Sequence, residues 1–265
     1  MGHRSYETGA LPMNGSCTTQ QHLLHATPAN NATLLDHLPD IPQGSQRIYL
    51  LRHGETEWNR KGMIQGGGFD IPLNSSGRRQ AEQAASCLST LLPALDVVAS
   101  SHLQRASETA DIIHAKQNGS SQRVVNKGLG EMRFGTMEGA IIRGPSADPA
   151  VQQHVQRQHT AMRSNKYLKW EGPEGESIHD VETRARRALR DLCETHPAAR
   201  YIAVVAHGRT NKILLQGILE MNEAESQQLV QGNTCINVLD RSANDEYTSR
   251  LINYTDHIND IEDGK

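Results

Sequence analysis

What the chain lacks excludes several classes of protein. Aromatic residues make up only 4% of the 265 residues, so we expect a core built from Leu, Ile, Val and Ala. The longest apolar runs are too short to span a bilayer, which predicts a soluble protein. The net charge is only −3, with both signs mixed along the chain. Composition therefore gives no case for binding to nucleic acid or to a membrane.

Cysteine is scarce and follows no pattern. The four cysteines are Cys17, Cys87, Cys193 and Cys235, and no two have the spacing of a metal or redox motif. His-x-His and His-Glu-x-x-His are also missing, so the 13 histidines predict no metal site. Free cysteines suit a reducing compartment, which favours the cytoplasm.

Residues 1–46 differ from the rest of the chain. They are rich in Ser, Thr, Asn, Gln, Pro and His and show no sustained apolar period. This predicts a disordered or loosely docked N-terminal extension ahead of one domain at residues 47–265. The extension carries Glu7, Asp36 and Asp40, whereas transit peptides are poor in acidic residues. Organelle targeting is therefore kept only as an alternative to the cytoplasm.

From residue 47 onward, short apolar runs alternate with amphipathic segments. Buried strands are expected at 48–51, 96–100, 201–206, 235–239 and 246–254. Helices are expected at 77–92, 103–115, 177–192 and 210–219, and within 149–170. Ser75 or Ser76 is expected to cap the first helix, and Ser177 with Asp180 has the form of a capping box. This order predicts an α/β protein, a three-layer α/β/α sandwich around a doubly wound, mainly parallel sheet.

Two of the expected strands end at a His-Gly pair. The strand at 48–51 leads to His53, and the strand at 201–206 leads to His207. Ligands of such sheets bind beyond the carboxyl ends of the strands. We therefore expect both histidines on one rim of the sheet.

Five motifs follow one another between residues 47 and 254. They are Leu50–Asn59 (LLRHGETEWN), Gln65-Gly66 with Asp70–Leu73, Ser101–Ala110 (SHLQRASETA), Leu129–Gly139 (LGEMRFGTMEG), and Gly175–Ser177 with Ala206–Gly208. Together they resemble the histidine phosphatase superfamily, also called the phosphoglycerate mutase-like family. A single Arg-His-Gly carries little weight, but five motifs in the family's order make chance a remote explanation.

The resemblance implies a role for each matching residue. His53 is the nucleophile that takes the phosphoryl group, and a nearby backbone carbonyl holds its other ring nitrogen. Arg52, Arg105 and His207 bind the phosphoryl oxygens, and Glu131 is the proton donor to the leaving oxygen. Further contacts to the phosphate are implied for Asn59, Gln65, Gly66 and Gly208.

The chemistry explains why these residue types are needed. Phosphate-monoester hydrolysis is among the slowest reactions that enzymes accelerate, because the anionic phosphoryl group repels nucleophiles. Imidazole is an uncharged nucleophile near pH 7, and guanidinium is always charged and bidentate toward phosphate. A carboxyl group beside bound phosphate has a raised pKa and can stay protonated. This chemistry needs no cofactor and implies a small phosphorylated molecule as the partner of a monomer or homodimer.

Several assignments have alternatives. Glu55, Glu57 and Glu138 are rivals to Glu131, which only the motif selects. A second set of cations either binds substrate or faces solvent: Arg143, Arg163 and Lys166.

The chain departs from the family pattern at three places. The loop from Gln65 to Phe69 is one residue longer than usual before Asp70, so we expect it to be more mobile. Arg209 stands where the family very often has a second Gly, and it either adds positive charge near the substrate or faces solvent. Gly130 replaces the more usual Arg or Asn before the acid.

The segment at 139–174 bears on the choice between hydrolase and mutase. It is shorter than the corresponding segment of cofactor-dependent phosphoglycerate mutases and only sparsely basic. This favours a phosphatase acting on a small metabolite such as a sugar phosphate, with the mutase as the alternative. A phosphate-binding protein without activity is a third possibility, and the presence of all five core residues counts against it.

Overall fold

The computed structural model describes residues 35, 38–90, 94–117 and 119–258. The predicted extension therefore lies largely outside the described residues. The part of it just before the sheet packs on the domain: Pro39 O and Ile41 O accept hydrogen bonds from Arg47 and Arg200, at 2.7 and 3.0 Å. None of the described helices is both long and apolar enough to cross a bilayer.

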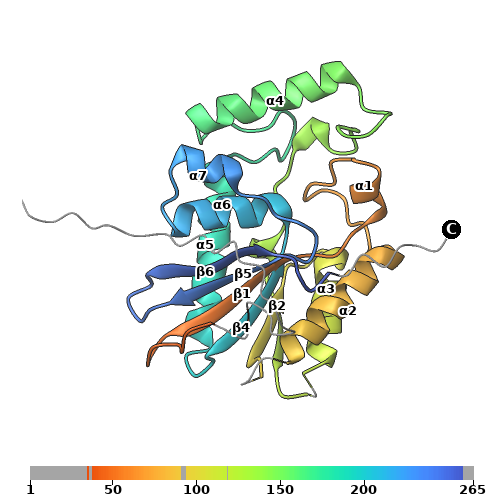
Figure 1. Cartoon of the computed structure of the whole chain (residues 1–265). Helices are drawn as coiled ribbons and strands as arrows, with labels where there is room; N and C mark the ends of the chain where they lie inside the picture. The colour runs from red at the N-terminus through yellow and green to blue at the C-terminus, as the bar shows by residue number, and fades with distance from the viewer. Residues whose placement is uncertain (1–34, 36–37, 91–93, 118, 259–265) are drawn as a thin grey trace, which may run out of the picture. The chain divides into compact units, whose positions relative to one another are not determined.

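Six strands form one sheet in the described part of the chain, in the order β3-β2-β4-β1-β5-β6 (Figure 1). They are β1 (Gln46–Arg52), β2 (Val97–Ser100), β3 (Gln122–Val125), β4 (Tyr201–Ala206), β5 (Ile236–Arg241) and β6 (Tyr247–Tyr254). The strands from β3 to β1 pair in parallel, whereas β5 is antiparallel to both β1 and β6. The predicted α/β class with a mainly parallel sheet is confirmed.

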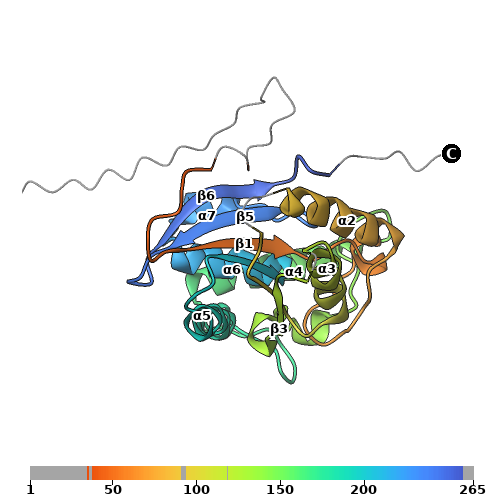
Figure 2. The same cartoon turned by 90° about the horizontal axis from the view of Figure 1, so that it is seen from below.

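Helices cover both faces of this sheet. They are α1 (Glu57–Arg60), α2 (Ser75–Ser89), α3 (Gln104–Ala115), α4 (Pro149–Ser164), α5 (Ile178–Thr195), α6 (Gly208–Ile218) and α7 (Glu223–Gln228). Figure 2 shows α2 and α3 on one side of the sheet and α5 and α6 on the other. The result is the predicted three-layer α/β/α arrangement.

The two core layers follow from the alternation of side chains along each strand. In β1, Ile48 and Leu50 pack against α5 and α6, whereas Tyr49 and Leu51 pack against α2 and α3. All four side chains are buried. A strand covered on both faces reads as a continuous apolar run, which is why the sequence reveals it.

A third apolar cluster lies beneath α4. Met162 on α4 packs with Trp170, Met132 and Ile213, the last of which lies on α6. Figure 1 shows α4 next to α6 and α7, on the side away from the strands. The helix expected within residues 149–170 ends at Ser164, and Trp170 lies in the irregular segment that follows, directly after the bridge from Lys169 to Ser177.

Helix termini show how local sequence sets the element bounds. Ser177 and Asp180 form the predicted capping box of α5. The expected cap of α2 is wrong: the helix begins at Ser75, two residues earlier than expected, and Asn74 is its cap, with its Oδ1 accepting from Gly77 N at 2.7 Å. Asn ranks beside Ser as an N-cap residue, so the choice depended on where the helix begins.

Candidate active site

The carboxyl ends of β1, β2 and β4 bring three side chains to one rim. His53 N donates to Ala206 O at 3.0 Å, and Ser101 N donates to Val205 O at 3.1 Å. The strands thus end side by side, and the rings of His53 and His207 lie 5.1 Å apart between centroids. Both histidines are buried. The prediction that they share a rim is confirmed.

His53 is held in one orientation and kept neutral. Its Nδ1 lies 2.6 Å from Gly54 O, so Nδ1 carries the proton and Nε2 is the nitrogen with the lone pair. Burial lowers its pKa well below 6.5, and the charges of Arg105 and Arg52 lower it further. At pH 7 the ring is therefore an uncharged nucleophile.

Gly54 has to be glycine because of a close approach. A Cβ at this position would overlap the carbonyl oxygen of Gly77, and a Cβ at Gly77 would overlap Glu55 O. The loop after β1 therefore lies directly on the first turn of α2. This contact fixes the loop that carries the Gly54 carbonyl beneath the His53 ring.

Two arginines, the half-buried Arg52 and the buried Arg105, lie near the histidines. Arg52 Nη1 donates to Gln231 O at 2.8 Å. Arg105 is fully buried and donates from Nη1 to Phe69 O and from Nη2 to Gly66 O, at 3.0 and 2.8 Å. Burial lowers the pKa of Arg105 to about 10, so it stays cationic at pH 7. The Nε atoms of both arginines are buried and have no hydrogen-bond partner among the described residues.

Ser101 orients His207. Its Oγ lies 2.7 Å from His207 Nε2 and also accepts from Leu103 N at 3.3 Å. The hydroxyl makes no other donor bond among the described residues, so we infer that it donates to Nε2, which leaves the ring proton of the neutral form on Nδ1. Burial lowers the pKa of His207 well below 6.5, and Arg105 and His53 add to this. Nδ1 is buried without a partner in the described structure.

Three N–H groups are thus buried without an acceptor among the described residues: Arg52 Nε, Arg105 Nε and His207 Nδ1. Asn59 adds a fourth, because its Oδ1 accepts from Thr56 N at 3.2 Å and its amide nitrogen is the end left to donate. Gly208 begins α6 beside them, and a Cβ there would lie 3.3 Å from Arg52 Nε. The amino end of α6 adds favourable dipole for an anion.

Glu131 is held at the same helix terminus. Its Oε1 accepts from Met132 N, Thr210 N and Thr210 Oγ1, at 2.9, 3.0 and 3.0 Å. Its Oε2 accepts only from Arg209 N, at 3.2 Å, among the described residues. Oε2 is therefore the oxygen with capacity left for a proton or a substrate.

The rival carboxylates have other partners. Glu138 Oε1 accepts from Gly68 N and Phe134 N at 3.3 and 3.0 Å. Glu55 accepts from Asn74 Nδ2 at 2.7 Å, and Glu57 pairs with Arg60 at 2.7 Å on the surface. The geometry favours Glu131 over all three.

The long loop after α1 supports Arg105. Gly66, at φ +61°, a conformation suited to glycine, presents its carbonyl to Arg105 Nη2. Gln65 is buried, and its Oε1 has no partner in the described part of the chain. Glu138 holds the loop from the other side through Gly68 N. Gly66 thus contributes by positioning Arg105.

Of the second set of cations, Lys166 is half exposed and lies 3.7 Å from Glu182. Arg163 pairs with Glu223 at 3.4 Å. Arg143 is exposed. Burial is the main cause that lowers the pKa of Arg52, and the charge of Arg143 is close enough to lower it further.

Four supporting residues escaped the sequence analysis. Ser101 orients His207, and Thr210 holds Glu131. Asn233 Nδ2 donates to His53 O at 3.1 Å, and Arg184 Nη2 donates to Glu131 O at 3.1 Å. Ser101 could have been predicted, because it directly follows the strand expected at 96–100 and opens the motif Ser101–Ala110. The other three depend on tertiary contacts that no local pattern records.

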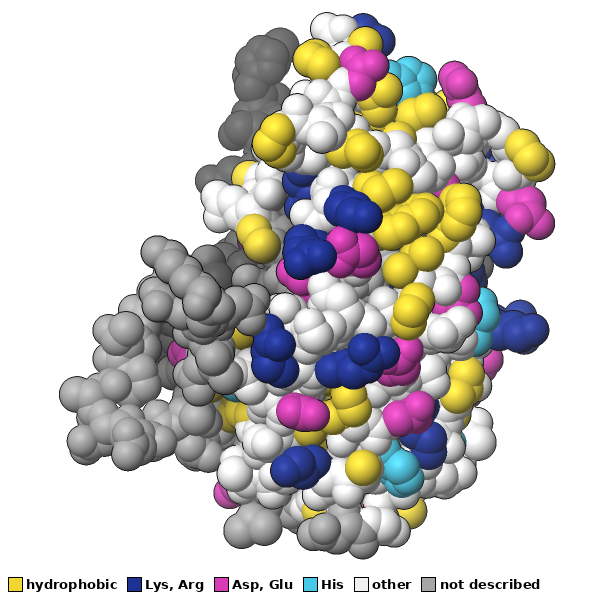
Figure 3. All heavy atoms as spheres, turned by 90° about the vertical axis from the view of Figure 1, so that its right-hand side faces the viewer, with side chains coloured by type: hydrophobic (Ala, Val, Ile, Leu, Met, Phe, Trp, Pro, Cys, Tyr) yellow, Lys and Arg dark blue, Asp and Glu magenta, His cyan; other side chains and the backbone are white. Residues whose placement is uncertain are grey.

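The surroundings show no competing metal site. Among the described residues, no group of three or more His, Cys, Asp or Glu could hold an ion. Seen from the right-hand side of Figure 1, cationic and anionic side chains are interspersed (Figure 3).

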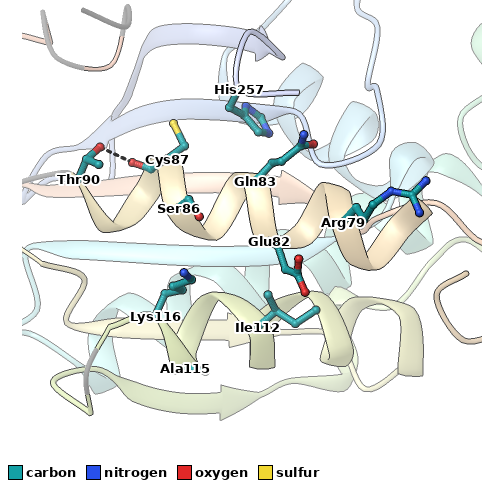
Figure 4. Close-up of a pocket in the computed structure, with 10 residues that line it drawn as sticks. All are labelled: Arg79, Glu82, Gln83, Ser86, Cys87, Thr90, Ile112, Ala115, Lys116 and His257. Carbon is teal, nitrogen blue, oxygen red and sulfur yellow. Dashed lines mark hydrogen bonds between the residues drawn. The ribbon is translucent and has the colours of Figure 1, made fainter. Parts of the chain in front are cut away.

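A separate pocket lies between α2 and α3 (Figure 4). It is lined by Arg79, Glu82, Gln83, Ser86, Cys87, Thr90, Ile112, Ala115, Lys116 and His257. None of the predicted site residues is among them.

The fold is α/β, and its rim holds a neutral histidine beside buried N–H groups that have no partner among the described residues. The family model described as histidine phosphatase superfamily (branch 1) matches residues 48–255. Phosphoglycerate mutase-like protein 4 of Arabidopsis thaliana is 30% identical over 211 residues, which are 80% of this chain and 86% of that protein. The chain therefore belongs to the histidine phosphatase superfamily.

Solved structures point to the same class. A mycobacterial glucosyl-3-phosphoglycerate phosphatase matches with a TM-score of 0.66 and 25% identity, covering 79% of this chain and 100% of that one. Phosphoserine phosphatase from Entamoeba histolytica matches with a TM-score of 0.62 and 29% identity, covering 80% and 98%. These neighbours are phosphatases of the same fold, in agreement with the predicted phosphatase.

Proposed function

We propose that the protein is a phosphatase that hydrolyses a small phosphorylated metabolite through a phosphohistidine on His53. The observation that carries this proposal is the set of buried N–H groups without partners among the described residues: Arg52 Nε, Arg105 Nε and His207 Nδ1. They surround a neutral ring whose Nε2 is free to attack. A phosphoryl group supplies the acceptor oxygens that these donors lack.

In the first step, His53 Nε2 attacks phosphorus and the bond to the ester oxygen breaks. Arg52, Arg105 and His207 donate to the non-bridging oxygens, where they stabilise the transition state. Glu131 Oε2 gives its proton to the departing oxygen, so the alcohol leaves neutral. The Gly54 carbonyl stabilises the positive charge that develops on the His53 ring.

In the second step, water opens the phosphohistidine. The Glu131 carboxylate takes a proton from the water as the oxygen attacks phosphorus and the P–N bond breaks. Inorganic phosphate leaves, and His53 and protonated Glu131 are restored. No metal or cofactor takes part in this scheme.

A mutase is the second candidate, because the Arabidopsis relative is named phosphoglycerate mutase-like. In a mutase, a second hydroxyl would replace water in opening the phosphohistidine. Against this, the segment at 139–174 carries no adjacent pair of arginines. The solved neighbours described above are named phosphatases, which favours hydrolysis.

The test is phosphate release from a panel of phosphate monoesters in EDTA, beside an assay for 3-phosphoglycerate to 2-phosphoglycerate interconversion. We expect fast release with little interconversion and full activity with chelator. His53→Ala should abolish turnover, whereas the matched control His196→Ala, at the end of α5, should not. Efficient interconversion without free phosphate, or substantial turnover by folded His53→Ala protein, would overturn the proposal.

Location and assembly are further parts of this proposal. We place the enzyme in the cytoplasm, as a monomer or homodimer that acts on a small molecule. Light scattering of the purified full chain would distinguish the two assemblies.

A further inference from the structure

Arg209 is a cation that the scheme above does not use. It is the second residue of α6, and its backbone N–H donates to Glu131 Oε2. Its side chain is half-buried. The Nε atom is buried and has no hydrogen-bond partner among the described residues. A buried donor without an acceptor costs free energy, which makes it a place to look for a ligand.

Two further cations lie beside it. Lys212 is three residues further along α6 and so lies on the same side of the helix. Arg163 comes from the last turn of α4. Burial lowers the pKa of Arg209, and Arg163 adds to this while Glu131 opposes it. Burial and both arginines lower the pKa of Lys212, which shows that the three cations are close enough to repel one another.

The negative charge nearby does not balance this group. Glu223 lies 3.4 Å from Arg163, but its side chain is 61% exposed. From Arg209, Glu131 accepts a hydrogen bond from the backbone N–H. No hydrogen bond from the Arg209 side chain to Glu131 is present in the described structure. Three cations thus share one exposed partner and the carboxylate that serves the chemistry.

Two ring nitrogens near these cations also lack hydrogen-bond partners among the described residues. His159 on α4 meets Trp170 edge-on, with 5.3 Å between ring centroids. His159 Nε2 and Trp170 Nε1 are buried without partners in the described part of the chain. Burial, and then the charges of Arg209, Arg163 and Lys212, lower the pKa of His159 to about 4. The ring is therefore neutral at pH 7 and adds no charge that would need balancing.

Glu131 links this group to the phosphate site. Its Oε2 accepts from Arg209 N at 3.2 Å, and its charge acts on Arg52 and Arg105 as well as on Arg209. In the proposed scheme Glu131 protonates the leaving oxygen, so the alcohol part of the substrate lies beside it. Groups beyond Glu131 consequently face the alcohol and not the transferred phosphoryl group.

We propose that Arg209, together with Lys212 and Arg163, binds a second anionic group on the alcohol part of the substrate. This inference rests on the proposed function and narrows the substrate to a phosphate monoester that also carries a carboxylate or a second phosphate. Charge-assisted bonds from guanidinium suit both groups.

Binding by catalytically inactive protein tests the subsite without turnover. In the His53→Ala background, titration calorimetry would compare O-phosphoserine with O-phosphoethanolamine, and fructose 1,6-bisphosphate with fructose 6-phosphate. Each pair differs by one anionic group. We expect at least about 10-fold tighter binding of the doubly anionic member in one pair, lost when Arg209→Gln is added. The pair that responds identifies carboxylate or phosphate, and equal affinities in both pairs would overturn the proposal.

Turnover by the otherwise wild-type full chain gives an independent readout. Arg209→Gln should lower kcat/KM about 10- to 100-fold for the preferred doubly anionic ester and leave its matched partner within about two-fold. Lys212→Gln, a second variant, should act in the same direction. The control is Arg157→Gln, an exposed residue of α4, which should change neither. An equal loss for both members of a pair would overturn the subsite, because Arg209 would then act on the chemistry at Glu131. If the protein binds the doubly anionic esters selectively but the wild-type chain turns none of them over, the proposed phosphatase activity is wrong.

Discussion

Ser101 Oγ lies 2.7 Å from His207 Nε2, and this contact decides which nitrogen of His207 can donate to a phosphoryl oxygen. Leu103 N–H donates to the same oxygen at 3.3 Å, and the hydroxyl makes no other donor bond among the described residues, so we infer that its proton points to the ring. His207 then carries its proton on Nδ1, the buried atom without a partner among the described residues. Ser101 is thus a positioning residue for the proposed phosphate site.

Ser101→Ala should weaken turnover without abolishing it. Losing a preorganised donor outright costs about 10²–10³ in rate, and we expect about 10-fold here because His207 stays in place but is free to change tautomer. Nitrogen NMR of the imidazole should show the Nδ1–H form in the wild type and a mixture in the variant. A merely structural role would lower the melting temperature and leave the tautomer unchanged.

Arg105→Gln should raise the pKa of His53. Burial is the main cause of its lowered value, and Arg105 is the first-ranked charge that lowers it further. Removing that cation stabilises the protonated ring, so the midpoint should move upward toward 6.5. Imidazole NMR between pH 8 and 5, assigned with His53→Ala, measures the shift directly. A midpoint that falls or stays fixed would contradict the placement of Arg105 beside His53.

Glu131→Gln should depend on the leaving group. An alkoxide needs a proton as it departs, so alkyl phosphates should lose about 10²–10³-fold in the phosphoryl-transfer step. A nitrophenolate departs without help, so that step should change little for p-nitrophenyl phosphate. Burst kinetics separates it from hydrolysis of the phosphohistidine, which also uses Glu131. Equal losses in the first step for both esters would point to Glu55 or Glu57 instead.

Much of the fold is predictable because its strands are buried on both faces. The runs at 48–51 and 201–206 are continuous and apolar, and each stops at a His-Gly pair, so both the strands and the rim follow from sequence. The strand β3 escaped because its four residues are only partly buried or exposed and carry no clear period. The helix α7 escaped for the same reason, since none of its residues is buried.

The site is predictable where a residue follows directly from its place after a strand. His53 and His207 are of this kind, and so in retrospect is Ser101. Thr210 could not be predicted, because its role depends on Glu131 approaching the start of α6 from a loop distant in sequence. For Arg209 the sequence left two possibilities, added charge or solvent exposure. Its half-buried place beneath α4 favours the first.

The two buried histidines predict a loss of stability as pH falls below 6.5. In the unfolded chain each histidine binds a proton with its ordinary pKa of 6.5, whereas burial keeps both His53 and His207 neutral in the folded protein well below that value. The unfolded state therefore binds more protons below pH 6.5. As the pH decreases, the free energy of unfolding also decreases, by at most about 1.4 kcal/mol per pH unit for each histidine. The stability that the two neutral histidines contribute is fully present above pH 6.5.

Urea unfolding at pH 7.5, 6.0 and 5.0 measures this dependence. His53→Ala removes one of the rings whose pKa is lowered by folding, so the free energy of unfolding of this variant should fall less steeply between pH 6.0 and 5.0, by about 1.4 kcal/mol per unit at most. His196→Ala, which removes a ring whose Nδ1 donates to Leu192 O at the far end of α5, is the control for losing a histidine elsewhere. If wild type and His53→Ala have equal slopes, His53 is protonated in the folded protein, and it could not then act as an uncharged nucleophile at the lower pH.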